Sequence, residues 1–121
     1  MYKFFDISEF NCKCQRLHAI NPASGELIKL LDDAREKASI PFKIVSGYRC
    51  HAHNKEVGGV ADSAHIKGLA ADISAITESQ KFKVLTALME SGFCRIGIYK
   101  NFIHCDIDGM KPQDVIWIGG E

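Results

Sequence analysis

Histidine and aspartate residues with the spacing of a metal site lie in the middle of the chain. Residues 63–72 follow the pattern Ser-x-His-x-x-Gly-x-Ala-x-Asp, which places His65 and Asp72 seven residues apart with Gly68 between them. Another histidine, His104, follows much later within the run Phe-Ile-His-Cys-Asp. Two imidazoles and one carboxylate are a ligand set of catalytic zinc, which keeps its fourth position for water. These three residues are therefore candidate metal ligands.

Each candidate ligand also has an ordinary structural explanation. A loop histidine and a strand aspartate are, singly, more often surface or capping residues, and a histidine in an apolar strand is often a satisfied core residue. The small residues between His65 and Asp72 favour the metal, because they let the backbone and a bulky ion approach closely. Alternation along residues 102–107 places His104 on the same face as Asp106 and away from the apolar face.

Two amphipathic helices are expected to flank the strands that position these residues. Asn21 and Pro22 predict the start of the first helix, with asparagine as its N-cap and proline at its first position. A capping box from Thr77 to Gln80 opens the second helix, and Gly92 is expected to end it. The buried stripe of this second helix is expected to consist of Phe82, Leu85, Leu88 and Met89.

Short strands are expected to carry Asp72 and His104. Alternation in the first of these strands points Asp72 away from the core face. A hairpin with a two-residue turn at 100–101 would place Gly97 opposite His104, leaving open space beside the histidine for a metal and a substrate. The mixture predicts an α+β fold, a small antiparallel sheet flanked by helices. The expected strands cover residues 42–46, 69–73, 95–99 and 102–107, and residues 115–118 add a last strand or cover the core.

Length and composition indicate a single domain over residues 1–121. Hydrophobic residues make up 46% of the chain and charged residues 25%, as in a soluble globular protein with one modest core. Fifteen basic residues balance fifteen acidic ones, so we expect no nucleic-acid partner, and the apolar stretches are too short for membrane insertion. We also expect a monomer. The first residues lack the features of a secretory signal, so we expect a cytoplasmic protein unless another route releases it.

The cysteines allow a second metal site as well as free thiols. Their odd number, without an export signal, favours reduced thiols over a disulfide framework. Cys12 and Cys14 could join a structural metal site with Cys50 or a histidine, although their spacing is tighter than that of a usual zinc-knuckle pair. The alternative is two free thiols near a surface turn, and no role is assigned to His18 or Cys94. The five cysteines are Cys12, Cys14, Cys50, Cys94 and Cys105.

A cysteine nucleophile at Cys50 is a weaker alternative. Cys50 stands next to His51 in the sequence, but a nucleophile and its base must meet through side-chain geometry, which adjacency does not arrange. We therefore do not expect a thiol protease.

Four motifs in order resemble those of the M15-type zinc D-Ala-D-Ala carboxypeptidases. They are Ser-Gly-Tyr-Arg at 46–49, Asn-Lys-Glu-Val-Gly-Gly at 54–59, the pattern at 63–72, and Phe-Ile-His-Cys-Asp at 102–106. The similarity covers most of the chain and is most like that of small stand-alone members from phages and prophages. It implies the fold shared by Hedgehog signalling domains and D,D-peptidases. It also implies one Zn²⁺ per chain, bound by His65, Asp72 and His104.

The resemblance implies substrate-binding roles as well. Arg49 is implied to contact the carbonyl or carboxylate of the substrate, which suits a permanently charged guanidinium, although a structural salt bridge is the alternative. Ser63 either donates a hydrogen bond to the substrate or caps its loop.

The general base is where the chain departs from the family pattern. D-Ala-D-Ala dipeptidases have a glutamate three residues before the last zinc histidine, where this chain has Asn101. Hedgehog-like members have a glutamate six residues before it, where this chain has Ile98. Asp106 remains as the candidate catalytic base, and a cross-strand ion pair with Arg95 is the competing interpretation.

The resemblance implies a zinc metallopeptidase that hydrolyses D-amino-acid peptide bonds in peptidoglycan stem peptides. It would act as a D-Ala-D-Ala carboxypeptidase or a lysin-type endopeptidase, reaching the cell wall if it is released as a phage lysin is. The alternative is a non-catalytic zinc-containing module of the same fold that binds peptidoglycan or has a structural role. The missing glutamate motivates this alternative.

Overall fold

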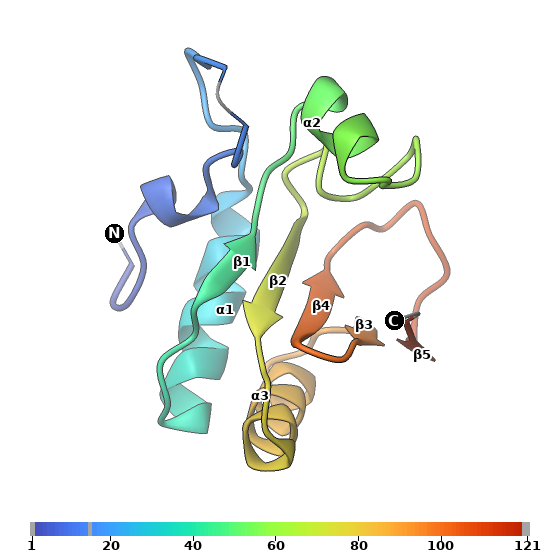
Figure 1. The fold of residues 1–121 in the computed structure, drawn as a ribbon. Coiled ribbons are helices and arrows are strands. Elements are labelled where there is room, and N and C mark those ends of the chain that lie inside the picture. The colour runs from blue at the N-terminus through green and yellow to red at the C-terminus, as the bar shows by residue number, and fades with distance from the viewer. Residues whose placement is uncertain (1, 15, 120–121) are drawn as a thin grey trace.

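The chain folds into a five-stranded sheet with helices packed on it (Figure 1). The computed structural model describes residues 2–14 and 16–119. The strand order is β1-β2-β4-β3-β5, and neighbouring strands are antiparallel except β3 and β5. This confirms the predicted α+β class and adds one parallel pair. The elements are η1 Ile7–Phe10, α1 Gly25–Ala38, β1 Ile44–Ser46, α2 His51–Glu56, β2 Ala70–Ser74, α3 Glu78–Glu90, β3 Arg95–Ile98, β4 Phe102–Asp106 and β5 Val115–Ile118.

Helix α1 begins later than the sequence predicts. Ser24 is its N-cap, because the Ser24 side chain accepts a hydrogen bond from the backbone N–H of Leu27. Asn21, the predicted cap, instead accepts from Ala23 N at 2.9 Å and donates to the carbonyl of Ile7 at 3.0 Å. Asparagine favours such local turns as strongly as it favours caps. Asn21 therefore fixes the loop that leads into the helix.

Helix α3 begins where its capping box predicts, but it buries a different face. Thr77 and Gln80 exchange the two hydrogen bonds of the box, and Gly92, with φ +103°, follows the end of the helix as expected. Phe82 is 69% exposed and Met89 is 52% exposed, so the predicted stripe is wrong at both positions. Helix α3 packs against α1 through a face other than the predicted one. The buried residues of α3 are Val84, Ala87 and Leu88.

The register of the central strands brings candidate ligands together. Asp72 in β2 lies directly opposite His104 in β4, and Gly97 in β3 lies opposite His104 on its other side, as the predicted hairpin requires. Ile73 and Ile103 point to the other face of the sheet, where both are fully buried in the core. Alternation therefore separates an apolar face from a face that carries chemistry.

The space over Gly97 is filled by Trp117, and the expectation of open space there was wrong. Strand β5 runs parallel to β3 with Gly97 opposite Trp117. A Cβ atom on Gly97 would lie 2.5 Å from Nε1 of Trp117, so only glycine fits under the indole. The indole N–H donates to the hydroxyl of Tyr99 at 3.0 Å, and the ring lies 5.4 Å from the imidazole of His104. The absence of a side chain at Gly97 thus allows the indole of Trp117 to lie beside His104.

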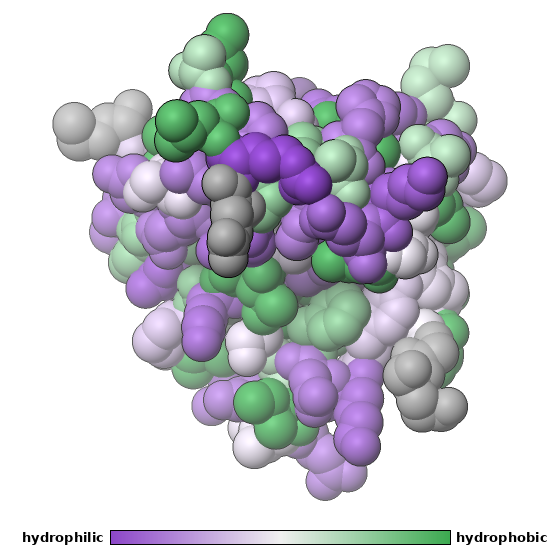
Figure 2. Space-filling model, turned by 45° about the horizontal axis from the view of Figure 1, so that its top comes forward, coloured by the Kyte–Doolittle hydropathy of each residue, from purple (hydrophilic) through white to green (hydrophobic). Residues whose placement is uncertain are grey.

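The surface shown in Figure 2 is mainly hydrophilic, with hydrophobic side chains interspersed among the polar ones. None of the helices in residues 2–14 and 16–119 has the length and apolar content that a membrane crossing requires. Some of the large apolar side chains that reach the surface, such as Leu17 and Met110, lie in loops, and others, such as Phe82 on α3 and Ile118 on β5, lie in helices or strands.

Candidate metal centre

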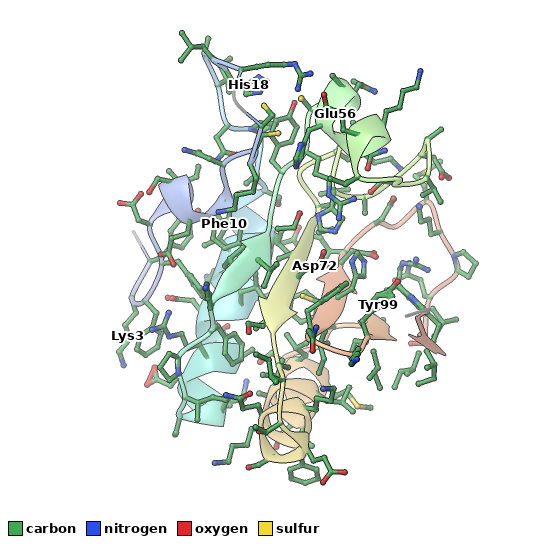
Figure 3. The ribbon with its side chains drawn as sticks, viewed as in Figure 1. Lys3, Phe10, His18, Glu56, Asp72 and Tyr99 are labelled. Carbon is green, nitrogen blue, oxygen red and sulfur yellow. The ribbon has the colours of Figure 1, made fainter. Side chains whose placement is uncertain are left out.

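The three candidate ligands meet over the middle of strands β2 and β4, where Asp72 pairs with His104. His65, Asp72 and His104 each offer a ligand atom, and these atoms all lie within 4.8 Å of one another. Oδ1 of Asp72 is 2.9 Å from Nδ1 of His104 and 3.3 Å from Nε2 of His65. Figure 3 labels Asp72 on β2, on the side of the neighbouring strand β4. The structure therefore brings together the three residues that the sequence pattern singles out.

His65 points an unpaired nitrogen at this cluster. Its Nδ1 lies 2.7 Å from the carbonyl oxygen of Gly47, and because a carbonyl only accepts, the proton of the neutral ring belongs on Nδ1. The lone pair is then on Nε2. Among the described residues, this Nε2 is the buried side-chain nitrogen or oxygen that lacks a hydrogen-bond partner, since its 3.3 Å approach to Asp72 lacks hydrogen-bond geometry. A cation between the nitrogen and the carboxylate would satisfy both.

A second carboxylate holds His104 from the opposite side of the ring. Nε2 of His104 donates to Oδ2 of Asp106 at 2.8 Å. Oδ1 of Asp106 accepts from Nε of Arg95 at 2.8 Å and from the backbone N–H of Asp108 at 3.1 Å. A carboxylate behind a histidine is the usual partner of a metal ligand, because it fixes the tautomer and the ring orientation. The ion pair between Asp106 and Arg95 that competed with the catalytic interpretation is present, and both oxygens of Asp106 are engaged.

Burial and hydrogen bonding act in opposite directions on the pKa values of this group. Burial alone would raise the pKa of Asp72, but the hydrogen bond from His104 and the charges of His104 and His65 outweigh it and hold that pKa well below its usual value. Burial would lower the pKa of His104, but hydrogen bonds to Asp106 and Asp72 raise it above its usual value. A proton and a metal compete for the imidazole of His104, so we expect metal binding to weaken as the pH falls.

Arg49 lies beside the cluster and is fixed by three neighbours. Its Nη2 is 3.4 Å from Oδ2 of Asp72, its Nε donates to Ser46 Oγ at 3.1 Å, and its Nη1 donates to Asn54 Oδ1 at 3.1 Å. The salt bridge considered as the alternative is thus present. Contact of Arg49 with a substrate stays a prediction. The bond from Arg49 to Asn54 ties the second sequence motif to the first, and Asn54 in turn donates to the carbonyl of Val60 at 2.8 Å.

The loop between Ser63 and Asp72 is shaped by its own hydrogen bonds and by the segment before α1. Ser63 is buried and its hydroxyl accepts from the backbone N–H of His65 at 3.1 Å, so it caps the loop, and its contact with a substrate stays a prediction. Gly68 has φ +74°, and a Cβ there would lie 2.2 Å from the carbonyl oxygen of Pro22. The group that approaches Gly68 closely is therefore the backbone of Pro22, and the space beside this glycine is not the position of an ion.

The candidate ligands face a cavity of about 380 Å³ with two chemically different walls. Aromatic rings form one part of the lining, namely Tyr99, Phe102 and Trp117. Cationic side chains form another part, namely Arg49, Arg95 and Lys111. The sequence did not indicate that Tyr99, Trp117 or Lys111 lines the cavity. Trp117 lies in β5 and Lys111 in the loop before it, and both reach the cavity through the long-range pairing of β5 with β3. This lining suits a small ligand that carries a carboxylate.

The fold and the cluster together define a candidate catalytic metal site of the kind found in hydrolases, with three protein ligands facing an open cavity. The chain belongs to the peptidase M15 family, whose family model matches residues 3–106. This range contains all three candidate ligands and Arg49, so the family resemblance of the sequence motifs is confirmed. The protein is accordingly a peptidase by family, with a candidate metal centre. None of the curated proteins compared with the chain matches it.

Proposed function

We propose that the protein is a zinc-dependent peptidase that hydrolyses D-amino-acid peptide bonds in peptidoglycan stem peptides. The observation that carries the zinc assignment is the unpaired Nε2 of His65 pointing at the carboxylate of Asp72, with His104 opposite. Two imidazoles and one carboxylate fit Zn²⁺ and leave its fourth position for water. Zinc bound there would polarise the scissile carbonyl and lower the pKa of its water toward neutrality.

The side chains around the cavity support a peptide substrate with a free carboxylate. Arg49 is fixed by three partners and faces the cavity, where its guanidinium can hold a substrate oxygen in a set orientation. Lys111 lines the same cavity, and its nearest ion partner, Asp62, is 3.7 Å away. The stacked rings of Tyr99 and Phe102 give an apolar surface for small side chains such as the methyl of alanine. The D-configuration is supported by the resemblance of the four motifs.

A zinc-containing module that binds such peptides without turnover is the second candidate function. Of the described residues that line the cavity, the acidic ones are Asp72 and Asp106. Asp72 faces the candidate metal position, and both oxygens of Asp106 already accept hydrogen bonds. A general base must reach the proton that it removes, and neither carboxylate is free to do so in this arrangement. This observation favours the binding module.

Muropeptide digestion distinguishes the two functions. Protein freed of metal with a chelator and protein reloaded with zinc are incubated with a pentapeptide stem and with a cross-linked dimer, and the products are identified by mass spectrometry. We expect D-alanine or separated stems from the zinc-loaded protein alone. Binding of the stem in calorimetry without any product would establish the binding module, and neither binding nor product would contradict both functions.

Substitution of Gly59 by alanine is expected to lower kcat/KM on the order of 100-fold, because displacing a positioning group by about 1 Å has effects of that size. A Cβ at Gly59 would lie 2.1 Å from Oδ1 of Asn54 and 3.0 Å from Nη1 of Arg49, so both side chains must move. The zinc content should not change, because no candidate ligand is touched. Gly109→Ala is the matched control, since nothing lies within 4 Å of its Cβ position. Equal rates for the two variants would contradict a role for Arg49 in turnover.

A further inference from the structure

A second group of metal-binding side chains lies outside the cavity, where the loop after η1 meets helix α2. Three of its members come from residues 12–18, and the fourth, Cys50, is the N-cap residue of α2. Figure 3 shows sulfur atoms between the loop that carries the labelled His18 and this helix. The ligand atoms of the four residues all lie within 4.8 Å of one another. The four residues, called the cysteine cluster below, are Cys12, Cys14, His18 and Cys50.

The two sulfur–sulfur distances within the cysteine cluster match the edges of a tetrahedral zinc site, and the sulfur–nitrogen distance is shorter than such an edge. Sγ of Cys50 lies 3.7 Å from Sγ of Cys12 and 3.9 Å from Sγ of Cys14. Sγ of Cys14 lies 3.1 Å from Nε2 of His18. Zinc–sulfur bonds of about 2.3 Å at tetrahedral angles separate two sulfurs by about 3.8 Å, and a sulfur and a nitrogen by about 3.5 Å. A disulfide would use only two of the three thiols and would leave the histidine unexplained.

Each sulfur of the cysteine cluster also accepts a backbone N–H. Cys12 accepts from the N–H of Cys50 at 3.3 Å, Cys14 from that of Arg16 at 3.4 Å, and Cys50 from that of His53 at 3.4 Å. Donors of this kind stabilise negative charge on sulfur, and the thiolate is the form that binds metal. They are the outer partners that hold metal ligands in place. The chain around the cluster is therefore arranged for three thiolates.

We propose that the cysteine cluster is a structural zinc site, separate from the candidate catalytic centre. Three cysteines and one histidine are a common structural zinc set, and four protein ligands leave no position for water or substrate. Under this assignment Cys12 and Cys14 are ligands of a structural metal and not free thiols, the two interpretations that the sequence leaves open. It gives His18 a role and raises the expected metal content from one zinc ion per chain to two.

The structural zinc would connect the N-terminal loop to the segment that carries Arg49. Cys50 follows Arg49 directly, and the backbone N–H of Arg49 donates to the carbonyl of His65 at 3.1 Å. The neighbouring N–H of Tyr48 donates to the carbonyl of Phe10 at 2.9 Å. A metal at the cluster would thus fix the backbone on which both Arg49 and His65 depend.

Zinc content and zinc ligation together test the proposal. We expect two zinc ions per wild-type chain by elemental analysis, one in the double variant Cys12→Ser/Cys14→Ser and one in Asp72→Asn. X-ray absorption of Asp72→Asn should show sulfur at about 2.3 Å around its remaining zinc, and the double variant should show only nitrogen and oxygen ligands. Cys94→Ser, the same change at an exposed thiol outside the cluster, should retain both ions.

The proposal is overturned if wild-type zinc has no sulfur ligand, or if the double variant retains two ions. A Cys12–Cys50 disulfide in protein isolated without added oxidant, seen by mass spectrometry, would overturn it as well. The measurement on Asp72→Asn keeps all three thiols, so it remains decisive if the double variant fails to fold. Two zinc ions in a protein that cleaves no muropeptide would support the structural site while contradicting the proposed peptidase activity.

Discussion

Asp72→Asn is expected to lower kcat/KM for stem-peptide hydrolysis by about three orders of magnitude and to remove zinc from the candidate catalytic centre. Metal catalysis contributes several kcal/mol to transition-state stabilisation, and each 1.36 kcal/mol is about tenfold in rate. Oδ1 of Asp72 lies 2.9 Å from Nδ1 of His104 and 3.3 Å from Nε2 of His65, so it is the member of the cluster nearest to both others. Asparagine keeps the size of the side chain but removes the charge that offsets the cation. Initial rates with added zinc and elemental analysis measure both effects.

Asp33→Asn is the control for this variant. Asp33 lies on the exposed face of α1, and the same chemical change there should leave rates and zinc content unaltered. Comparing thermal unfolding of Asp72→Asn and wild type, both without metal, separates a lost ligand from a lost fold. Rates within tenfold of wild type in Asp72→Asn with zinc still at this centre would show that the ligand set is wrong.

Asp106→Ala is expected to destabilise the fold by about 3–5 kcal/mol, the usual cost of removing one partner of a buried ion pair. The Arg95 side chain is only 11% exposed and would lose the carboxylate that its Nε contacts at 2.8 Å. His104 would lose the acceptor that orients its ring, and such losses lower metal affinity or activity about 10- to 100-fold. Urea unfolding and zinc titration measure the two effects separately.

The double variant Arg95→Met/Asp106→Leu separates the stability effect from the effect on His104. Apolar side chains of similar volume often replace a buried ion pair without loss of stability. We therefore expect unfolding close to that of wild type, while zinc affinity stays low because the acceptor for His104 is still missing. Recovery of zinc affinity together with stability would contradict the positioning of His104 by Asp106.

The pH profile of Asp106→Asn distinguishes positioning from general-base catalysis. A base that must be deprotonated gives kcat/KM an acidic limb, and removing that base removes the limb. Both oxygens of Asp106 are engaged, so we expect the limb to persist at a lower overall rate. Loss of the limb would establish Asp106 as the base that the sequence suggests.

Local signals in the sequence predict the ends of helices better than their faces. The capping box at Thr77 marks the start of α3 because its hydrogen bonds join residues three apart. Two residues near α1 can both cap, and only the packing of the preceding loop decides that Ser24 does so and Asn21 does not. The exposure of Phe82 likewise depends on how α3 meets α1, which periodicity does not encode.

The grouping of the candidate ligands follows from alternation and from a short hairpin, both visible in the sequence. These rules place Asp72 and His104 on one face, and the structure pairs them directly. The surroundings of the site depend on contacts between distant segments. Trp117 covers Gly97 because β5 pairs in parallel with β3, and Cys50 reaches Cys12 although 38 residues separate them. No short pattern specifies either contact.

The positions of the ligands along the chain set the order in which the residues of the two sites become available while the protein is being made. A chain leaves the ribosome from its N-terminus, at about 5–20 residues per second, and its early segments are released first. All residues of the cysteine cluster are present once Cys50 has been synthesised. The candidate catalytic centre also needs His104 of β4, which is synthesised later and pairs with Asp72. Trp117 adds its wall to the cavity later still. A partly synthesised chain that ends after Cys50 thus contains all four residues of the cysteine cluster but none of the three candidate ligands of the catalytic centre.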